Sequence, residues 1–161
     1  MMKLDRENIR IDSTATSKAE AIREAGTLLT QSHYIKAGYV NSMMEREKVA
    51  NTFLGNGIAI PHGLPKDRDE IIRTGIAVVQ IPNGVEWNPG EIVYLVVGIA
   101  ARSDEHIEVL SNLTTLLGDE ALIRQLSATP DPNDIIMSLT NAAAAQPAAA
   151  QAQLPDFPMA I

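Results

Sequence analysis

Two stretches decide the fold: residues 74–81, TGIAVVQI, and residues 92–101, IVYLVVGIAA. Both are nearly continuous apolar runs rich in β-branched residues, which is typical of strands covered on both faces. A shorter run at residues 57–61, GIAIP, predicts a brief buried strand that stops where proline removes a backbone donor. The sequences PNG at 82–84 and NPG at 88–90 predict turns between the two long runs.

Helical patterns precede these runs. Residues 17–20, SKAE, have the spacing of a capping box, and apolar residues then recur at helical intervals to about residue 32. A second, short amphipathic helix is predicted over residues 39–44, with the charged residues 45–48 beyond its apolar stripe. Its methionines are expected in the core.

Helical patterns also follow the runs. Apolar residues between 107 and 117 lie on one helical face, and shorter helices are predicted near residues 120–127 and 131–139. Strands with helices on either side along the chain predict an α/β fold, in which a central mixed sheet is flanked by helices on both faces.

The length of 161 residues fits one domain. We expect this domain to span residues 1–141, because residues 142–152 hold eight alanines, two glutamines and one proline. Residues 142–161 are therefore predicted to be a disordered linker or tail. The chain is interpreted as one module of a longer polypeptide, the alternative being that the tail is a docking peptide.

The net charge of −7 argues against nucleic-acid and membrane-surface binding and favours a basic partner. With no cysteine, disulfides, thiolate zinc sites and thiol catalysis are excluded. The longest apolar run is half of what a membrane span needs, and the N-terminus lacks the apolar segment of a signal peptide. We therefore expect a cytoplasmic protein without membrane insertion.

The histidines are the candidates for chemistry. His62 lies between Pro61 and Gly63 at a strand end, where its ring is expected to be exposed at the rim of the sheet. His106 follows a potential helix cap at residues 103–105, so it is predicted in the first turn of a helix, neutral and able to donate toward an anion. For each, a water-facing residue without a role is the alternative. His33 is predicted to be a surface residue.

Together with Arg46, these two imidazoles could hold and transfer a phosphoryl group. A neutral imidazole is nucleophilic near pH 7, and a planar guanidinium neutralises the transferred group. A zinc hydrolase using both histidines is a weaker alternative, because no HExxH-like spacing is present. A serine hydrolase would need a GxSxG element, which the sequence lacks.

The segments 51–63, NTFLGNGIAIPHG, and 98–106, GIAARSDEH, resemble the two active-site segments of EIIA domains of the bacterial phosphoenolpyruvate-dependent sugar phosphotransferase system, mannitol/fructose class. The resemblance implies a phosphotransferase component in which His62 is phosphorylated at Nε2. It also implies that His106 hydrogen-bonds the phosphoryl group and that Arg46 helps to neutralise it. No metal or organic cofactor is implied.

Mannitol-type domains carry a glutamate six residues before the active histidine, where this chain has Asn56. The sequence LGNGIAIPH at residues 54–62, together with Glu86-Trp87, is more similar to the fructose-type domain that begins the diphosphoryl transfer proteins. The implied donor is HPr or a fused HPr-like domain, and the implied acceptor is a cysteine of a fructose-type EIIB. A regulatory, nitrogen-type EIIA, whose phosphorylation state controls partner proteins, is the alternative.

Overall fold

The computed structural model describes residues 4–102 and 106–145. Its centre is a mixed sheet with the strand order β1-β4-β5-β3-β2. The strands are β1 (Ile9–Arg10), β2 (Phe53–Gly55), β3 (Ile58–Ala59), β4 (Gly75–Asn88) and β5 (Glu91–Ala100). The pairs β1–β4 and β3–β5 are parallel, whereas β4–β5 and β2–β3 are antiparallel.

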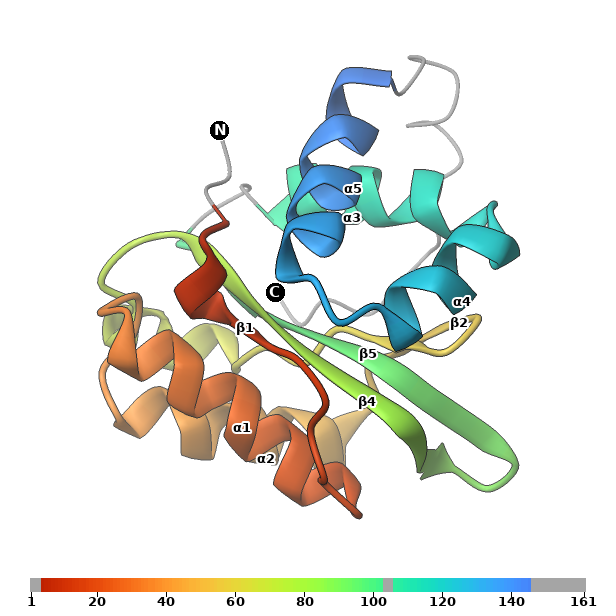
Figure 1. Cartoon of the computed structure of the whole chain (residues 1–161). Helices are drawn as coiled ribbons and strands as arrows, with labels where there is room; N and C mark the ends of the chain where they lie inside the picture. Colours follow the sequence, from red (N-terminus) through yellow and green to blue (C-terminus); the bar gives the residue numbers. More distant parts are fainter. Residues whose placement is uncertain (1–3, 103–105, 146–161) are drawn as a thin grey trace.

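Helices cover both faces of this sheet, as predicted (Figure 1). One layer holds α1 (Lys18–Gln31) and α2 (Gly38–Val49), and the other holds α3 (His106–Leu117), α4 (Glu120–Ala128) and α5 (Pro132–Ala145). Two short 3-10 helices, η1 (Arg6–Asn8) and η2 (Pro65–Glu70), complete the described elements. Within the described residues no helix is both long and apolar enough to cross a membrane.

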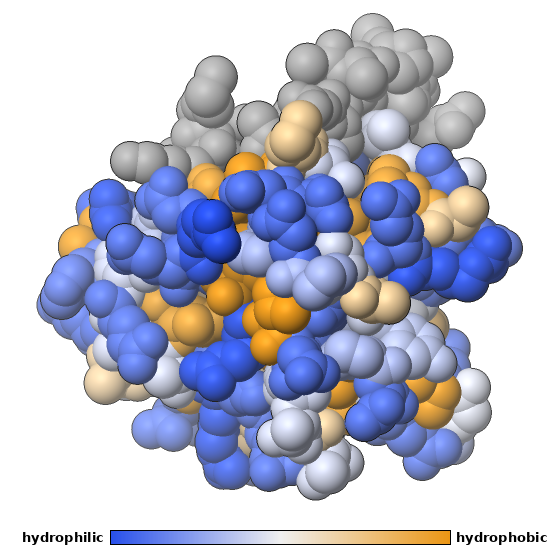
Figure 2. Space-filling model, viewed as in Figure 1, coloured by the Kyte–Doolittle hydropathy of each residue, from blue (hydrophilic) through white to orange (hydrophobic). Residues whose placement is uncertain are grey.

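The long strands are buried on both faces, which explains their unbroken apolar sequence. In β4, Ala77 and Val79 belong to the core cluster under α1 and α2, while Ile76 and Val78 belong to the cluster under α3, α4 and α5. This alternation follows from the two-residue period of a strand. On the face drawn in Figure 2, apolar side chains reach the surface mainly in a strip between the layer of α1 and the layer of α4 and α5.

The turn predicted at residues 82–84 is wrong, because these residues lie inside strand β4. The pairing shifts here: Gln80 faces Leu95 and Val85 faces Val93, so residues 81–84 oppose Tyr94 alone. Gly84, at φ +78°, allows the extra residues to bulge without ending the strand. The other predicted turn, at residues 88–90, is confirmed, because the hairpin turns at Pro89 and Gly90.

Two helices are longer than their patterns predict. Helix α2 extends through the charged residues 45–48, and it buries Arg46 and Glu47. Helix α5 continues to Ala145, four residues into the predicted tail at 142–161, of which 146–161 lie outside the described residues. Helix α1 begins as predicted, since the Ser17 hydroxyl accepts the Glu20 N–H at 3.1 Å.

Candidate functional site

His62 lies just beyond β3, where the chain still pairs with β5. It forms a parallel bridge with Ile99, whose N–H donates to the Pro61 carbonyl at 2.9 Å. The expectation of a ring exposed at the rim of the sheet is wrong, because His62 is only 6% exposed. This isolated bridge lies beyond the end of β3 at Ala59, and the chain there runs through the packed interior. The alternative of a water-facing loop histidine is therefore excluded.

The ring of His62 is held in one tautomer by its own backbone. Its Nδ1 lies 2.9 Å from the Ile60 carbonyl oxygen. Since a carbonyl can only accept, Nδ1 carries the proton in this contact, and in a neutral ring the lone pair is on Nε2. In this tautomer Nε2, and not Nδ1, is the nitrogen that is a potential nucleophile.

Side chains from α2 hold the segment that follows His62. The Tyr39 hydroxyl accepts the Gly63 N–H at 2.8 Å and donates to the Ile99 carbonyl at 3.3 Å. One turn later, the Ser42 hydroxyl accepts the Leu64 N–H at 2.7 Å. Burial raises the pKa of Tyr39 to about 12, so this hydroxyl stays protonated at neutral pH.

Ser42 also reaches η2. Its hydrogen bond to the Asp67 carboxylate is the largest of the causes that lower the pKa of Asp67. Asp67 is therefore ionised at neutral pH, and Ser42 joins the Leu64 backbone to the first turn of η2. The chain after His62 is in this way fixed to α2 at two successive residues.

Glycine is required at position 63 by this close approach. A Cβ there would lie 2.7 Å from Tyr39 Cζ and 2.9 Å from Ser42 Oγ, and would also overlap Tyr39 Cε1. These separations are shorter than van der Waals contacts. The sequence Pro61-His62-Gly63 thus combines a residue without an N–H and a residue without a side chain around the histidine.

Arg46 lies on α2 one turn after Ser42, on the same helix side, and it is 1% exposed. Its Nη1 donates to the Ala50 carbonyl at 2.5 Å. Burial lowers the pKa of Arg46, and the adjacent Glu47 carboxylate offsets part of that effect. A guanidinium nonetheless keeps its charge in proteins. Arg46 is therefore a cation on α2, the helix whose side chains hold the segment after His62.

Glu47 is the centre of a buried polar cluster that the sequence did not predict. Its carboxylate accepts the Thr52 N–H and, at 2.5 Å, the Thr52 hydroxyl. It also accepts from Trp87 Nε1 at 3.0 Å and from Lys18 Nζ at 3.3 Å. Because the Thr52 carbonyl accepts the Ile60 N–H at 2.9 Å, the cluster anchors the chain that leads into His62.

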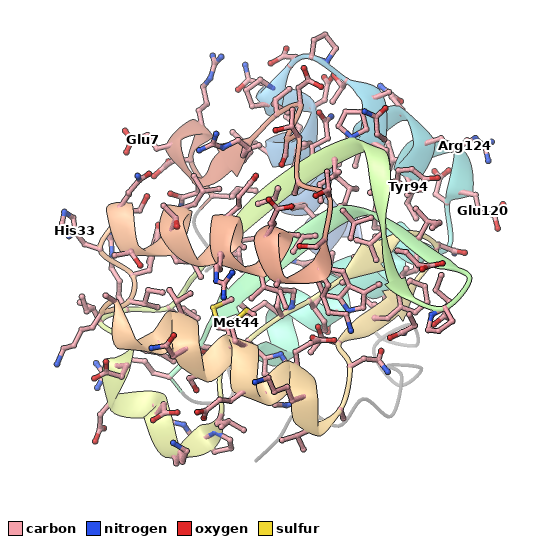
Figure 3. The ribbon with its side chains drawn as sticks, turned by 90° about the horizontal axis from the view of Figure 1, so that it is seen from below. Glu7, His33, Met44, Tyr94, Glu120 and Arg124 are labelled. Carbon is pink, nitrogen blue, oxygen red and sulfur yellow. The ribbon has the colours of Figure 1, made fainter. Side chains whose placement is uncertain are left out.

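The other histidines are placed as follows. His106 is the first residue of α3, which agrees with the predicted helix start, but its side chain lies outside the described residues. Its role, and its contact with His62 or Arg46, therefore stay predictions. His33 is exposed, as predicted, and lies at the periphery of the molecule (Figure 3). Among the described side chains, no three His, Cys, Asp or Glu form a group suited to a metal ion.

Asn56 lies in the turn between β2 and β3, at φ +46°. Its amide nitrogen donates to the Leu117 carbonyl at 2.8 Å, so it ties this turn to the end of α3. His62 follows at the other end of β3. The asparagine therefore has a structural contact of its own, separate from the histidine.

A pocket of about 480 Å³ lies near Asn56, away from His62. Its walls are the β2–β3 turn, the β4–β5 hairpin at Tyr94, and the side of α4 that carries Glu120 and Arg124. In Figure 3 these three labelled side chains gather at one edge of the molecule. The pocket is thus at the start of the β3–β5 pair, whereas His62 is at its end.

Sequence reasoning missed the residues that support His62. The helical pattern at residues 39–44 places Tyr39 in an apolar stripe and gives no reason to select Ser42 or Glu47. The available signal was the placement of polar atoms at positions 39, 42 and 46, which share one side of a helix. Their partners at 63, 64 and 99 are distant in sequence, so the pattern alone does not identify them.

Comparison with known proteins gives consistent results. The sequence profile of the family described as phosphoenolpyruvate-dependent sugar phosphotransferase system, EIIA 2, matches residues 2–142. A multiphosphoryl transfer protein of Rhodobacter capsulatus is 58% identical over 162 residues, covering 100% of this chain and 19% of that protein. The mannitol-specific phosphotransferase enzyme IIA component of Bacillus subtilis is 40% identical over 84% of this chain and 95% of its own length.

Among solved structures, a complex of enzyme IIAMTL and phosphorylated enzyme IIBMTL from Escherichia coli contains a similar chain. Its TM-score is 0.83 with 39% identity, over 88% of this chain and 99% of that one. The chain spans about a fifth to a third of the multiphosphoryl transfer proteins that it matches. The similarity therefore covers one domain of those longer proteins.

Proposed function

Because the chain belongs to the EIIA 2 family of the phosphoenolpyruvate-dependent sugar phosphotransferase system, we propose that it carries phosphoryl groups on Nε2 of His62. The observation that supports this most directly is the 2.9 Å contact between His62 Nδ1 and the Ile60 carbonyl. That contact places the ring proton on Nδ1, and this tautomer supports Nε2 as the nitrogen that would attack phosphorus.

The reaction needs no proton transfer at this ring. The Nε2 lone pair attacks phosphorus on the donor's phosphohistidine, the donor P–N bond breaks, and its electron pair returns to the donor imidazole. His62 then bears the phosphoryl group on Nε2 while Nδ1 keeps its proton on the Ile60 carbonyl. When a thiolate attacks phosphorus in the second step, the P–N electron pair returns to Nε2 and a neutral imidazole leaves.

Two further residues are proposed to act on the transferred group. Arg46, a buried cation on the helix that holds residues 63 and 64, would neutralise its developing charge. His106, the first residue of α3, would hydrogen-bond a phosphoryl oxygen near the positive end of that helix. Neither role requires a metal or an organic cofactor.

The proposed donor is HPr or an HPr-like domain in the same polypeptide, and the proposed acceptor is the cysteine of an EIIB domain. The net charge of −7 suits a donor with a basic surface, because complementary charge speeds transient encounters. We propose the fructose type for the acceptor, since identity to multiphosphoryl transfer proteins reaches 58%, against 42% or less for the mannitol-specific relatives. Such a relay would operate in the cytoplasm.

Phosphorylation in a reconstituted relay tests the function. The protein is incubated with phosphoenolpyruvate, enzyme I and HPr, and the phosphate bound to it is measured for stability in acid and base. We expect one acid-labile, base-stable phosphate, lost in His62→Ala and retained in the matched control His33→Ala. Full labelling of His62→Ala would refute the assignment.

The sugar class is tested by the acceptor. The phosphorylated protein is mixed in separate reactions with a fructose-type and a mannitol-type EIIB, and single-turnover transfer to each is timed. Faster transfer to the fructose type is expected. Equal or faster transfer to the mannitol type would overturn the fructose proposal and leave the phosphocarrier role intact.

A further inference from the structure

The ladder between β3 and β5 changes its bonding at His62. A parallel ladder around a paired residue uses two bonds, from the partner's N–H to the preceding carbonyl and from the following N–H to the partner's carbonyl. Here the first is present, from Ile99 N–H to Pro61 carbonyl at 2.9 Å. In the second place, the Tyr39 hydroxyl accepts the Gly63 N–H at 2.8 Å and donates to the Ile99 carbonyl at 3.3 Å.

We propose that the Tyr39 hydroxyl is the positioning group of His62, closing the β3–β5 ladder on the C-terminal side of the histidine and thereby keeping Nδ1 on the Ile60 carbonyl. This rests on the proposed phosphocarrier function. Tyr39 is a positioning residue, because its contacts are with Gly63 and Ile99 and not with the imidazole.

The fixed backbone explains why one hydroxyl matters. The orientation of the His62 ring is set by its hydrogen bond to the Ile60 carbonyl, only two residues earlier. This bond therefore persists only while the backbone of residues 60–63 is held in place. Pro61 contributes no N–H to that segment. The bonds of Ile99 to Pro61 and of Tyr39 to Gly63 therefore hold His62 on its two sides.

The environment of Tyr39 is built for this bond. Tyr39 is 3% exposed, and the absence of a side chain at Gly63 lets its ring approach the backbone. Ser42 repeats the arrangement on the next residue, accepting the Leu64 N–H. Two hydroxyls on one side of α2 thus bind the two successive backbone N–H groups that follow His62.

The test is Tyr39→Phe, which removes one oxygen and keeps the ring. The matched control is Tyr34→Phe, since Tyr34 is also buried, at 2% exposure. The Arg73 Cζ lies 4.3 Å from the centre of the Tyr34 ring, a contact that phenylalanine keeps. In unphosphorylated protein, ¹⁵N chemical shifts of the His62 ring report the tautomer. We expect distinct signals of a protonated Nδ1 and an unprotonated Nε2 in the wild type and in Tyr34→Phe, and partly averaged signals in Tyr39→Phe.

The kinetic readout is single-turnover transfer onto and off His62. We expect Tyr39→Phe to be slower by about 10- to 100-fold, the loss typical of a misplacement near 1 Å, while Tyr34→Phe stays within about twofold of the wild type. A folded Tyr39→Phe with wild-type ring shifts and rates would overturn the proposal.

Failure of the phosphocarrier function and failure of the positioning role of Tyr39 give different results in these experiments. If the wild type accepts no phosphate, the phosphocarrier function fails, and the ring shifts still decide whether Tyr39 positions His62. If Tyr39→Phe does not fold, Ser42→Ala, which releases Leu64, takes its place. Averaged ring shifts in Ser42→Ala support the positioning by α2 hydroxyls, and unchanged shifts contradict it.

Discussion

Replacing Glu47 by glutamine should destabilise the domain although the two side chains have the same shape. Every described partner of the Glu47 carboxylate is a donor: Thr52 through its N–H and hydroxyl, Trp87 through Nε1, and Lys18 through Nζ. An amide has one oxygen and one NH₂. With the NH₂ in place of Oε2, the Trp87 N–H faces a donor and loses its acceptor. With the NH₂ in place of Oε1, the oxygen keeps the Trp87 and Thr52 N–H groups and the Thr52 hydroxyl turns to accept, so the glutamine adopts this orientation.

The magnitude follows from which bonds are weakened. In the favoured orientation the bonds from the Trp87 and Thr52 N–H groups remain but lose the charge of the acceptor, at about 1 kcal/mol. The ion pair with Lys18, whose side chain is 30% exposed, adds about 0–1 kcal/mol. We therefore expect the free energy of unfolding to fall by about 1–2 kcal/mol. With a urea m-value of about 2 kcal/mol/M, the midpoint falls by about 0.5–1 M.

Urea unfolding followed by tryptophan fluorescence measures this change, because Trp87 is the one tryptophan of the chain. Trp87→Phe provides the control by circular dichroism: in that background the Glu47→Gln substitution should be less destabilising, because the Trp87 bond that glutamine weakens is gone. An unchanged midpoint in Glu47→Gln, or an equal loss in both backgrounds, would refute the reasoning.

Three other changes have defined outcomes. Gln80→Met removes an amide that donates at 2.8 Å to the carbonyls of Leu126 and Thr129, so urea unfolding should show a loss of about 2–4 kcal/mol; a loss below about 1 kcal/mol would contradict this. Gly63→Ala forces a Cβ against the Tyr39 ring and should slow phosphorylation as well as destabilise by about 1–3 kcal/mol, measured by labelling and melting; wild-type labelling would count against the tight packing. Burial raises the pKa of Tyr39 from 10.0 to about 12, so the stability that its protonated hydroxyl contributes is complete about one unit below pH 10 and is lost as the pH rises. The loss is about 2 kcal/mol at pH 12 and about 3 kcal/mol in all above that pH. An absorbance step of tyrosinate near pH 12 that is absent in Tyr39→Phe would check the shift.

Much of the architecture is predictable because its signals are local. The apolar runs at 74–81 and 92–101 are strands with two buried faces, and helical periodicity correctly gives helices on either side of them. The turn predicted at residues 82–84 does not form. Proline and glycine predict a turn, but pairing with β5 resumes at Val85, and the long ladder absorbs the irregularity as a bulge.

The sequence by itself determined the strands, the helical layers and the position of His62 at a strand end, because periodicity and turn chemistry act over a few residues. Only the tertiary structure decided which nitrogen of His62 carries the proton, and that Arg46 and Glu47 are buried. It also decided what holds the histidine in place. Tyr39 and Ile99 are 60 residues apart and Glu47 and Trp87 are 40 apart. Such contacts depend on how helix α2 packs against the sheet, which no local pattern specifies.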